Sequence, residues 1–243
     1  MKKKTSVAAH LSLASFIGLV SQSSWAGQGS AAPSLDFTVH YLSKIITPEG
    51  VTREAQYSET VIRRPGHVWV ARVLPRGAEL AENGQPQKMH ASFPAEAEHA
   101  HFNHVLIPRH IVQSKEKTSI EFIDRTNQLR ISVPASEYGN VNFDGSWENS
   151  FYLIDPVLLQ QMRATGSWGK CLAGQWYERE KNGIFQKICW DAQRQIPLIV
   201  ESGDRAGTFF NRVVVQAAEH LQAKLPWANL KGLASREYAD YLD

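Results

Sequence analysis

Histidines are concentrated in one stretch of this 243-residue chain, and imidazole is the side chain that most often ligates transition metals in proteins. A zinc or copper ion needs two or three imidazole nitrogens that converge on one point at about 2.1 Å. On a strand, alternation places His99 and His101 on the same side. His104 and His110 then lie on the other side. A zinc or copper site would therefore use His99 and His101 with a partner such as His90, or would need a bend at Asn103. The alternative is a polar loop and strand start whose histidines face water.

The sequence contains no constellation for hydrolytic or phosphoryl-transfer chemistry. A serine and an aspartate occur close together in Ser202-Gly203-Asp204, but this tripeptide is a turn signal between two predicted strands, and there is no G-x-S-x-G motif. The glycines are scattered rather than grouped into a loop that could hold a phosphate. We therefore expect a protein that is not an enzyme and that has no cofactor, unless the histidines hold a metal.

Two cysteines, Cys171 and Cys189, are too few for a disulfide-rich scaffold or a four-cysteine zinc module. They lack the C-x-x-C spacing of a redox-active pair, so a disulfide is the expected state in an exported protein. Asn182-Gly183 predicts a tight hairpin turn, and if Lys181 faces Ile184 across it the two cysteines are not directly opposed. A bridge then requires the glycine-containing stretch 169–174 to bend or bulge.

Hydrophobic periodicity predicts a fold built mainly from strands. In residues 36–47 the side chains alternate, which places Phe37, Val39 and Tyr41 on one face. Turn signals at Pro48-Glu49-Gly50 and Pro65-Gly66 join this segment to two further strands in an antiparallel meander. The strands predicted over the whole chain are 36–47, 51–64, 67–74, 101–112, 119–124, 128–133, 174–179, 184–190, 196–201 and 208–216.

The remaining segments are predicted to be loops and helices. Residues 75–98 have no clear period and form a long excursion, and residues 134–149 form a loop rich in Gly, Asn and Ser. Asp155 and Pro156 suit the first positions of a helix that ends near Gly166, and another helix is predicted over residues 226–242. The expected fold class is α+β: a large curved antiparallel sheet, or open half-barrel, with two or three helices covering its concave face.

Apolar and aromatic side chains on these strands supply either a packed core or the wall of a cavity. A curved sheet of this size can enclose an apolar cavity against its helices. The candidate residues for such a wall are Phe37, Val39, Tyr41, Trp69, Val73, Ile188, Trp190 and Phe209. The alternative is that most of these side chains are core.

The first residues have the layout of a cleaved secretory signal peptide. Lys2-Lys3-Lys4 precede an apolar stretch over residues 7–20, and Ser24-Trp25-Ala26 places small residues where a signal peptidase needs them. The predicted organisation is a signal peptide over 1–26, a flexible leader over 27–34 and a single domain over 35–243, located in the periplasm. No later apolar run is long enough to span a membrane.

The overall charge argues against nucleic acid as a partner. Three of the 26 basic residues lie in the predicted signal peptide, which leaves 23 basic residues against 24 acidic residues. A chain this close to neutrality has no basic footprint for a phosphate backbone.

Two stretches of the sequence resemble the periplasmic lipoprotein-carrier-like superfamily of LolA, LolB and RseB. Arg64-Pro65-Gly66-His67-Val68-Trp69-Val70 is similar to the start of an early hairpin in that superfamily. Trp190-Asp191, followed by the stretch from Ile196 to Glu201 and then by Asp204 and Gly207, is similar to its W-x-D … l-P-l … e … D-x-x-G stretch. The resemblance implies an open half-barrel that binds acyl chains or lipidated peptides between sheet and helices without catalysis. It also implies kinship with envelope-stress sensors that bind a regulator.

Three functions are therefore expected, in order of preference. The first is a non-enzymatic periplasmic protein that holds a lipid, an acyl chain or a lipidated peptide in an apolar cavity. The second is a metal-binding or metalloprotein-maturation factor that uses the region from His90 to His110. The third is an envelope sensor or interaction module that binds a protein partner.

Overall fold

The computed structural model describes residues 32–74, 104–115, 117–166, 171 and 174–241, which belong to one compact unit, Ala32–Asp243. The predicted signal peptide, most of the predicted leader and the candidate metal ligands His90, His99 and His101 lie outside the described residues. No helix in the described part of the chain is long and apolar enough to cross a membrane.

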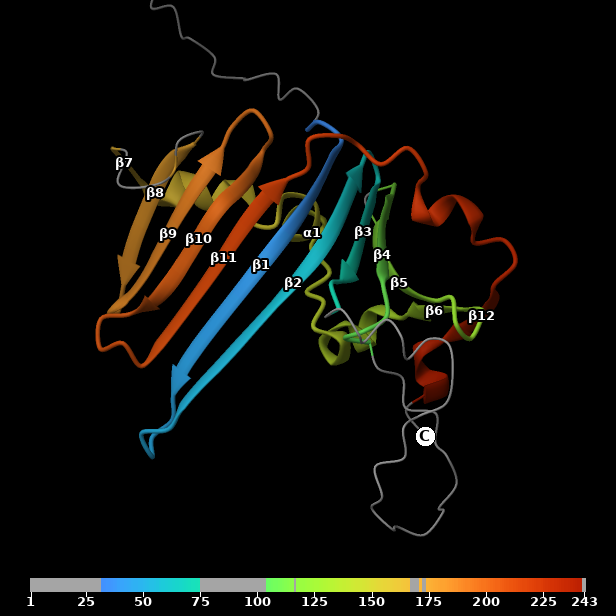
Figure 1. Cartoon of the computed structure of the whole chain (residues 1–243), viewed down its shortest axis with the longest axis horizontal. Helices are drawn as coiled ribbons and strands as arrows, with labels where there is room; N and C mark the ends of the chain where they lie inside the picture. Colours follow the sequence, from blue (N-terminus) through green and yellow to red (C-terminus); the bar gives the residue numbers. More distant parts are fainter. Residues whose placement is uncertain (1–31, 75–103, 116, 167–170, 172–173, 242–243) are drawn as a thin grey trace, which may run out of the picture. The chain divides into compact units, whose positions relative to one another are not determined.

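Twelve strands account for most of the described chain (Figure 1). They are β1 (Leu35–Ile46), β2 (Thr52–Arg64), β3 (His67–Arg72), β4 (Arg109–Ser114), β5 (Lys117–Asp124), β6 (Leu129–Val133), β7 (Arg163–Thr165), β8 (Gln175–Lys181), β9 (Ile184–Asp191), β10 (Ile196–Asp204), β11 (Phe209–Ala217) and β12 (Ala234–Glu237).

All twelve strands form one sheet, in the order β12-β6-β5-β4-β3-β2-β1-β11-β10-β9-β8-β7. The sheet is open, because β12 and β7 are its two edges. Neighbouring strands are antiparallel except β12 and β6, which are parallel, so the sheet is mixed rather than wholly antiparallel. The predicted class, an α+β fold on a large open curved sheet, is confirmed.

The helices of the described residues are short. They are η2 (Ala135–Val141), α1 (Trp147–Tyr152), η3 (Pro156–Gln161), η4 (Pro226–Asn229) and η5 (Tyr238–Tyr241), of which only α1 is an α-helix. The prediction of a loop over 134–149 is wrong, because η2 and the start of α1 lie there. The Ser146 hydroxyl oxygen starts α1 by accepting a hydrogen bond from the Asn149 backbone N–H at 3.0 Å.

The two predicted helices are only partly correct. Asp155 does cap a helical segment, since its side chain accepts a hydrogen bond from the Val157 N–H at 2.9 Å. That segment is the 3-10 helix η3, which ends at Gln161 and is followed by β7. The helix predicted over 226–242 is wrong: the segment is divided between η4, β12 and η5. Gly232 lies between η4 and β12 and is a poor helix former.

The sheet buries both of its faces against different parts of the chain. On one face, strand residues such as Val39, Val68 and Ile111 pack with Trp147 and Phe151 of α1 to form the main core. We call this the helix-covered face. On the opposite face, Ile62, Trp69 and Ile123 pack against Leu225, Trp227, Leu230 and Leu233. These four side chains belong to residues 218–233, which lead from β11 to β12 and which we call the C-terminal strap (Figure 1).

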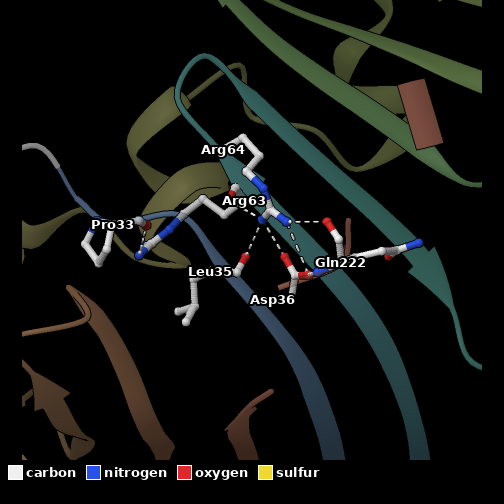
Figure 2. Close-up of polar contacts among 6 residues, drawn as sticks. All are labelled: Pro33, Leu35, Asp36, Arg63, Arg64 and Gln222. Atoms are coloured by element: carbon white, nitrogen blue, oxygen red, sulfur yellow. Dashed lines mark hydrogen bonds and ion pairs between the residues drawn. The ribbon is translucent and has the colours of Figure 1, made fainter. Parts of the chain in front are cut away.

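Two consecutive arginines at the end of β2 tie these layers together. Arg63 is fully buried on the helix-covered face, where its Nη1 donates to the carbonyl oxygens of Phe151 and Gln195 at 3.2 Å each. Its Nη2 donates to the carbonyl oxygen of Pro33 at 3.0 Å (Figure 2). The same nitrogen also donates to the carbonyl oxygen of Arg194 at 2.6 Å. Burial lowers the pKa of Arg63 to about 10, so the guanidinium remains charged at neutral pH.

Arg64 points to the opposite face and holds the strap. Both of its terminal nitrogens donate to the Asp36 carboxylate, and its Nη2 also donates to the Gln222 carbonyl oxygen at 3.2 Å (Figure 2). Asp36 in turn accepts a hydrogen bond from the Gln222 backbone N–H. The pair of arginines therefore fixes the helical layer on one face and the beginning of the strap on the other.

A disulfide joins Cys171 to Cys189, as predicted. Lys181 faces Ile184 across the β8–β9 turn, so Cys189 lies opposite Trp176 in the ladder and Cys171 reaches it from outside the strand. The predicted bend is at Gly174. A Cβ atom on Gly174 would lie 2.6 Å from the Trp190 carbonyl oxygen, so the close approach requires glycine.

Replacing Gly174 by alanine is expected to lower the free energy of unfolding by about 1–3 kcal/mol, because the added methyl group must displace backbone atoms and the disulfide. Chemical denaturation of the oxidised protein measures the change. Gly139→Ala is the matched control, since a Cβ there has no heavy atom within 4 Å. Equal stability of the two variants would contradict the assigned close packing at Gly174.

Candidate functional site

A cavity of about 270 Å³ lies between the helix-covered face and the helical layer. We call it the central pocket. Its floor is formed by sheet residues Tyr41, Glu59, Val61, Val70, Arg109 and Ile111. Its roof is formed by Asn142, Phe143, Asp144, Asn149, Ser150 and Leu153. The floor comes from β1 to β4, whose register places Val61 beside Val70 and Val70 beside Arg109.

The floor contains an ion pair whose carboxylate is buried and whose guanidinium is partly exposed. The two terminal nitrogens of Arg109 donate to the two carboxylate oxygens of Glu59, each at 3.1 Å, which is the bidentate geometry that suits a guanidinium. The Glu59 residue is only 6% exposed. Such a pair is stable in a cavity only because each charge is hydrogen-bonded by the other.

Tyr41 completes the floor next to Glu59. Burial, and after it the charge of Glu59, raise the pKa of the Tyr41 phenol, so the hydroxyl stays protonated. This hydroxyl interacts with the Glu59 carboxylate, and the Tyr41 ring stacks on Tyr57 with ring centres 4.5 Å apart. The floor of the pocket is therefore polar but without net charge.

The roof is held in place by a capping network at the start of α1. The Asp144 carboxylate accepts a hydrogen bond from the Ser146 N–H at 2.9 Å and another from the Asn149 side-chain amide. Ser146 in turn caps the helix. Asn149 and Ser150 thus present polar groups at the pocket from a fixed helix start, while Phe143 and Leu153 supply apolar surface. This combination suits a ligand with an apolar body and a polar end.

The eight predicted wall residues are divided between the two faces. Six of them share the helix-covered face, as the strand register shows: Phe37, Val39, Tyr41, Ile188, Trp190 and Phe209. Of these, Tyr41 lines the central pocket. Phe37 and Val39 belong to the main core, and Ile188 and Trp190 pack against Leu159 and Met162.

Trp69 and Val73 lie on the opposite face from the other six. Trp69 pairs with Ile62 and packs under the strap, and the Val73 N–H donates to the Ser58 carbonyl oxygen at 2.9 Å. The segment 67–74 is apolar almost throughout, so its sequence did not indicate which side chains face which way. The eight residues therefore do not form a single wall.

The candidate metal ligands His90, His99 and His101 lie outside the described residues, so the zinc or copper site stays a prediction. Within the described residues, no group of three or more His, Cys, Asp or Glu side chains could hold a metal ion. His110, which shares the same stretch of sequence, has both ring nitrogens engaged: Nδ1 lies 3.0 Å from Glu121 Oε1, and Nε2 lies 3.0 Å from His67 Nδ1.

Sequence reasoning missed the ion pair of the central pocket. Glu59 lies in a predicted strand whose polar residues were expected on a wet face, and Arg109 follows a long segment without periodicity. The one available signal was the position of Glu59 two residues before Val61, which places both side chains on the same face of a strand. Its partner could not be found without the pairing of β3 with β4.

Comparisons with known proteins find similar folds but no related sequence. No protein-family model matches the chain, and no curated protein sequence matches it. Among solved structures, PNGF-II is similar with a TM-score of 0.37 and 10% identity, over 85% of this chain and 32% of that one. The MucA/MucB complex of Pseudomonas aeruginosa is similar with a TM-score of 0.33 and 10% identity, over 78% of this chain and 53% of that one.

A LolA superfamily protein from Nitrosomonas europaea is also similar, with a TM-score of 0.32 and 9% identity, over 81% of this chain and 89% of that one. The chain spans about a third of the PNGF-II chain and about half of the matched chain of the MucA/MucB complex. All three TM-scores are below 0.5, and no property of these proteins carries over to this chain on that basis.

Proposed function

We propose that this chain is a non-enzymatic binding protein of the periplasm that holds an acyl chain, a lipid or a lipidated peptide in the central pocket. The observation that supports this function is the pocket itself, which lies between the sheet and a helical layer. Its lining combines apolar side chains with polar groups that together carry no net charge. An acyl chain would gain about 0.8 kcal/mol for each methylene that it buries against Val61, Val70 and Leu153.

The polar groups of the pocket favour an amphipathic ligand over a purely apolar one. Glu59 is already satisfied by Arg109, so an apolar segment can cover the floor without leaving a charge unpaired. Asn149 and Ser150 lie on the roof, where they could hydrogen-bond the polar end of the ligand. A lipidated peptide or a fatty acid offers such an end, since each carries amide or carboxylate groups next to the chain.

The disulfide supports an oxidising compartment, and therefore export. Disulfides form and persist in secreted and periplasmic proteins and are rare in the bacterial cytosol. Cys171 and Cys189 are both buried and paired. The signal-like residues 1–26 point to the same compartment, although they lie outside the described part of the chain.

A protein partner is a second candidate, supported by the edge of β2. β2 pairs with β3 only from Glu59 onward, and Thr52–Tyr57 have no ladder partner on that side among the described residues. All six residues of this stretch are exposed. A free strand edge can accept an extended segment of another protein through main-chain hydrogen bonds.

Filling the central pocket is expected to weaken ligand binding. In the Ser150→Trp variant the indole would occupy the roof of the cavity, and we expect the affinity for a dansylated undecanoic acid probe to fall at least tenfold, about 1.4 kcal/mol. Dansyl fluorescence titration measures the affinity, and circular dichroism verifies that the variant is folded.

Glu148→Trp is the matched control, because it places the same indole on the exposed side of α1 and should bind the probe like the wild type. If Ser150→Trp binds the probe with unchanged affinity while folded, the ligand does not use the central pocket. If the wild-type protein binds no acyl probe and instead captures an extended peptide, the second candidate replaces the first.

A further inference from the structure

A chain of hydrogen-bonded ionisable groups crosses four strands on the face opposite to the central pocket. His110 on β4 lies beside Trp69 of β3 and Glu121 of β5. Its Nδ1 is 3.0 Å from Glu121 Oε1, and its Nε2 is 3.0 Å from Nδ1 of His67. Arg130 on β6 holds the other carboxylate oxygen of Glu121 at 2.7 Å. The order of the chain is therefore Arg130, Glu121, His110, His67.

The geometry limits how many protons the two imidazoles can carry. If His110 donates its Nδ1–H to Glu121, its neutral form must accept at Nε2, and His67 must then donate from Nδ1. One additional proton is tolerated, because it can sit on the far nitrogen of His67. A second additional proton places an N–H on both His110 Nε2 and His67 Nδ1, which are 3.0 Å apart. The hydrogen bond between the two rings is then lost, because neither nitrogen can accept, and two positive charges face each other.

The C-terminal strap docks directly on this imidazole pair. The ring of Trp227 is stacked on His67 and on His110, with ring centres 5.3 and 5.2 Å apart and both planes within 13° of parallel. Trp69 packs beside them, with its ring centre 6.5 Å from that of Trp227. Leu230 is buried on the same face. The strap thus covers the imidazole pair with the Trp227 ring, whose position depends on the two imidazole rings that it contacts.

The charged groups around the pair are few and are themselves paired. Arg64 of β2 lies opposite His67 in the ladder but binds the Asp36 carboxylate, and Glu121 binds Arg130. Arg125, in the β5–β6 turn, donates to the carbonyl oxygen of Pro226 in the strap. No carboxylate other than Glu121 contacts either imidazole among the described residues, so a second added proton has no counter-charge to stabilise it.

The ionisation of the flanking groups is consistent with this limit. Burial, and after it the charge of His110, lower the pKa of His67 below its ordinary value of 6.5. Burial alone would raise the pKa of Glu121, but the hydrogen bonds from His110 and Arg130 outweigh it and lower the pKa of this carboxyl. Glu121 therefore remains a charged acceptor when the solution is mildly acidic.

We propose that His67 and His110 form a pH-sensitive latch that keeps the C-terminal strap docked at neutral pH and releases it on acidification. With the pair unprotonated or singly protonated, the hydrogen bond persists and Trp227 stays in place. When both imidazoles become charged, they move apart and Trp227 loses its stacking contacts with them. The strap then separates from the sheet, and the apolar surface of Ile62, Trp69 and Ile123 becomes accessible.

The sign of the effect follows from linkage. The docked form binds fewer protons than the released form over the pH range between the lowered pKa of His67 and the ordinary value of 6.5. Docking therefore weakens as the pH falls through this range. If docking lowers the pKa of an imidazole by one unit, the docking equilibrium weakens tenfold at a pH below the pKa values of both the docked and the released form.

Hydrogen–deuterium exchange of the full chain tests the latch. After correction for the intrinsic pH dependence of exchange, amides of residues 225–233 should exchange at least about tenfold faster at pH about 5 than at pH about 7, while core amides of β1 should not change. In His67→Phe the ring can still stack on Trp227 but cannot be protonated, so this acceleration should disappear. His40→Gln is the control: His40 lies on the same face but bonds Ser58 at 2.7 Å, and this variant should retain the wild-type response.

Histidine side-chain NMR of the wild-type protein gives a measurement that does not depend on any variant. The latch requires the His67 imidazole to titrate below its ordinary value of 6.5, with the Trp227 indole signal following that titration. A His67 imidazole that titrates at its ordinary value of 6.5, or strap amides whose corrected exchange does not depend on pH, would overturn the proposal. A pH response that survives in His67→Phe would do the same.

Discussion

Replacing Arg63 by methionine is expected to lower the free energy of unfolding by about 3 kcal/mol, the upper end of the cost of leaving a buried hydrogen-bond acceptor without a donor, because four carbonyl oxygens lose Arg63 together. Methionine has a similar length and fills the space, but it donates no hydrogen bonds. The Phe151 carbonyl oxygen would then lose the Arg63 donor at a buried contact, and the carbonyl oxygens of Gln195, Pro33 and Arg194 would lose it at partly buried ones. Urea denaturation measures the change.

Two further variants separate this effect from the mere loss of a positive charge. Arg53→Met removes an arginine from the exposed half of the same strand and should change stability by less than about 0.5 kcal/mol. Arg63→Lys keeps the charge but loses the planar fork of donors, so its stability should lie between those of the wild type and Arg63→Met. If Arg63→Met is as stable as Arg53→Met, the four carbonyl contacts contribute nothing.

Arg63 also links the stability of the fold to the central pocket. Its Nη1 and its aromatic contact both reach Phe151, with the guanidinium carbon 4.9 Å from the ring centre. Phe151 belongs to α1, which carries Asn149 and Ser150 on the roof of the pocket. An Arg63 variant that still folds should therefore bind the acyl probe more weakly than the wild type, because the roof is no longer fixed to β2.

The strands could be predicted where a single face is buried. Residues 36–47 alternate in the sequence, and β1 buries Phe37 and Val39 on the face expected from that pattern. The turn at Asn182-Gly183 was equally informative, because both residues have positive φ and fix the register of β8 against β9. Local pattern and local turn chemistry were sufficient in these cases.

The C-terminal region could not be predicted because its structure depends on distant parts of the chain. Leu230 and Leu233 have helical spacing, yet both pack flat against Ile62 and Ile123 on the sheet. β12 is exposed at all four positions and exists because it pairs with β6, about a hundred residues earlier in the sequence. A short exposed edge strand has no hydrophobic alternation that would reveal it.

The same dependence on long-range register hid the two polar clusters. Glu59 contacts Arg109, and His67 contacts His110, only because β3 pairs with β4. The long segment between these strands in the sequence does not indicate which residues of β3 and β4 lie opposite each other. The sequence groups His110 with the histidines that precede it, whereas the structure places its partners on β3 and β5. Residue types could be recognised from the sequence, but their partners could not.

Removing the disulfide is expected to be the second large effect. In the double variant Cys171→Ala, Cys189→Ala, the free energy of unfolding should fall by about 3 kcal/mol, the loop-closure value for a bridge with a sequence separation of 18. Alanine is preferable to serine here, because both cysteines are buried and a hydroxyl group would need a hydrogen-bond partner. Denaturation with and without reductant measures the effect.

The bridge stabilises more than the unfolded-state entropy alone suggests, because it supports a small apolar cluster. Cys171, Cys189 and Trp176 form this cluster with Leu198 and Ile199 on the face that also carries the C-terminal strap. The double substitution should therefore destabilise the protein by at least as much as reduction of the wild type, because it also removes two buried sulfur atoms from the cluster, and reductant should leave the double variant unchanged. If reductant lowers the free energy of unfolding equally in both proteins, the bridge is not the origin of the reductant effect. If reductant changes neither protein, Cys171 is held by packing rather than by its covalent bond.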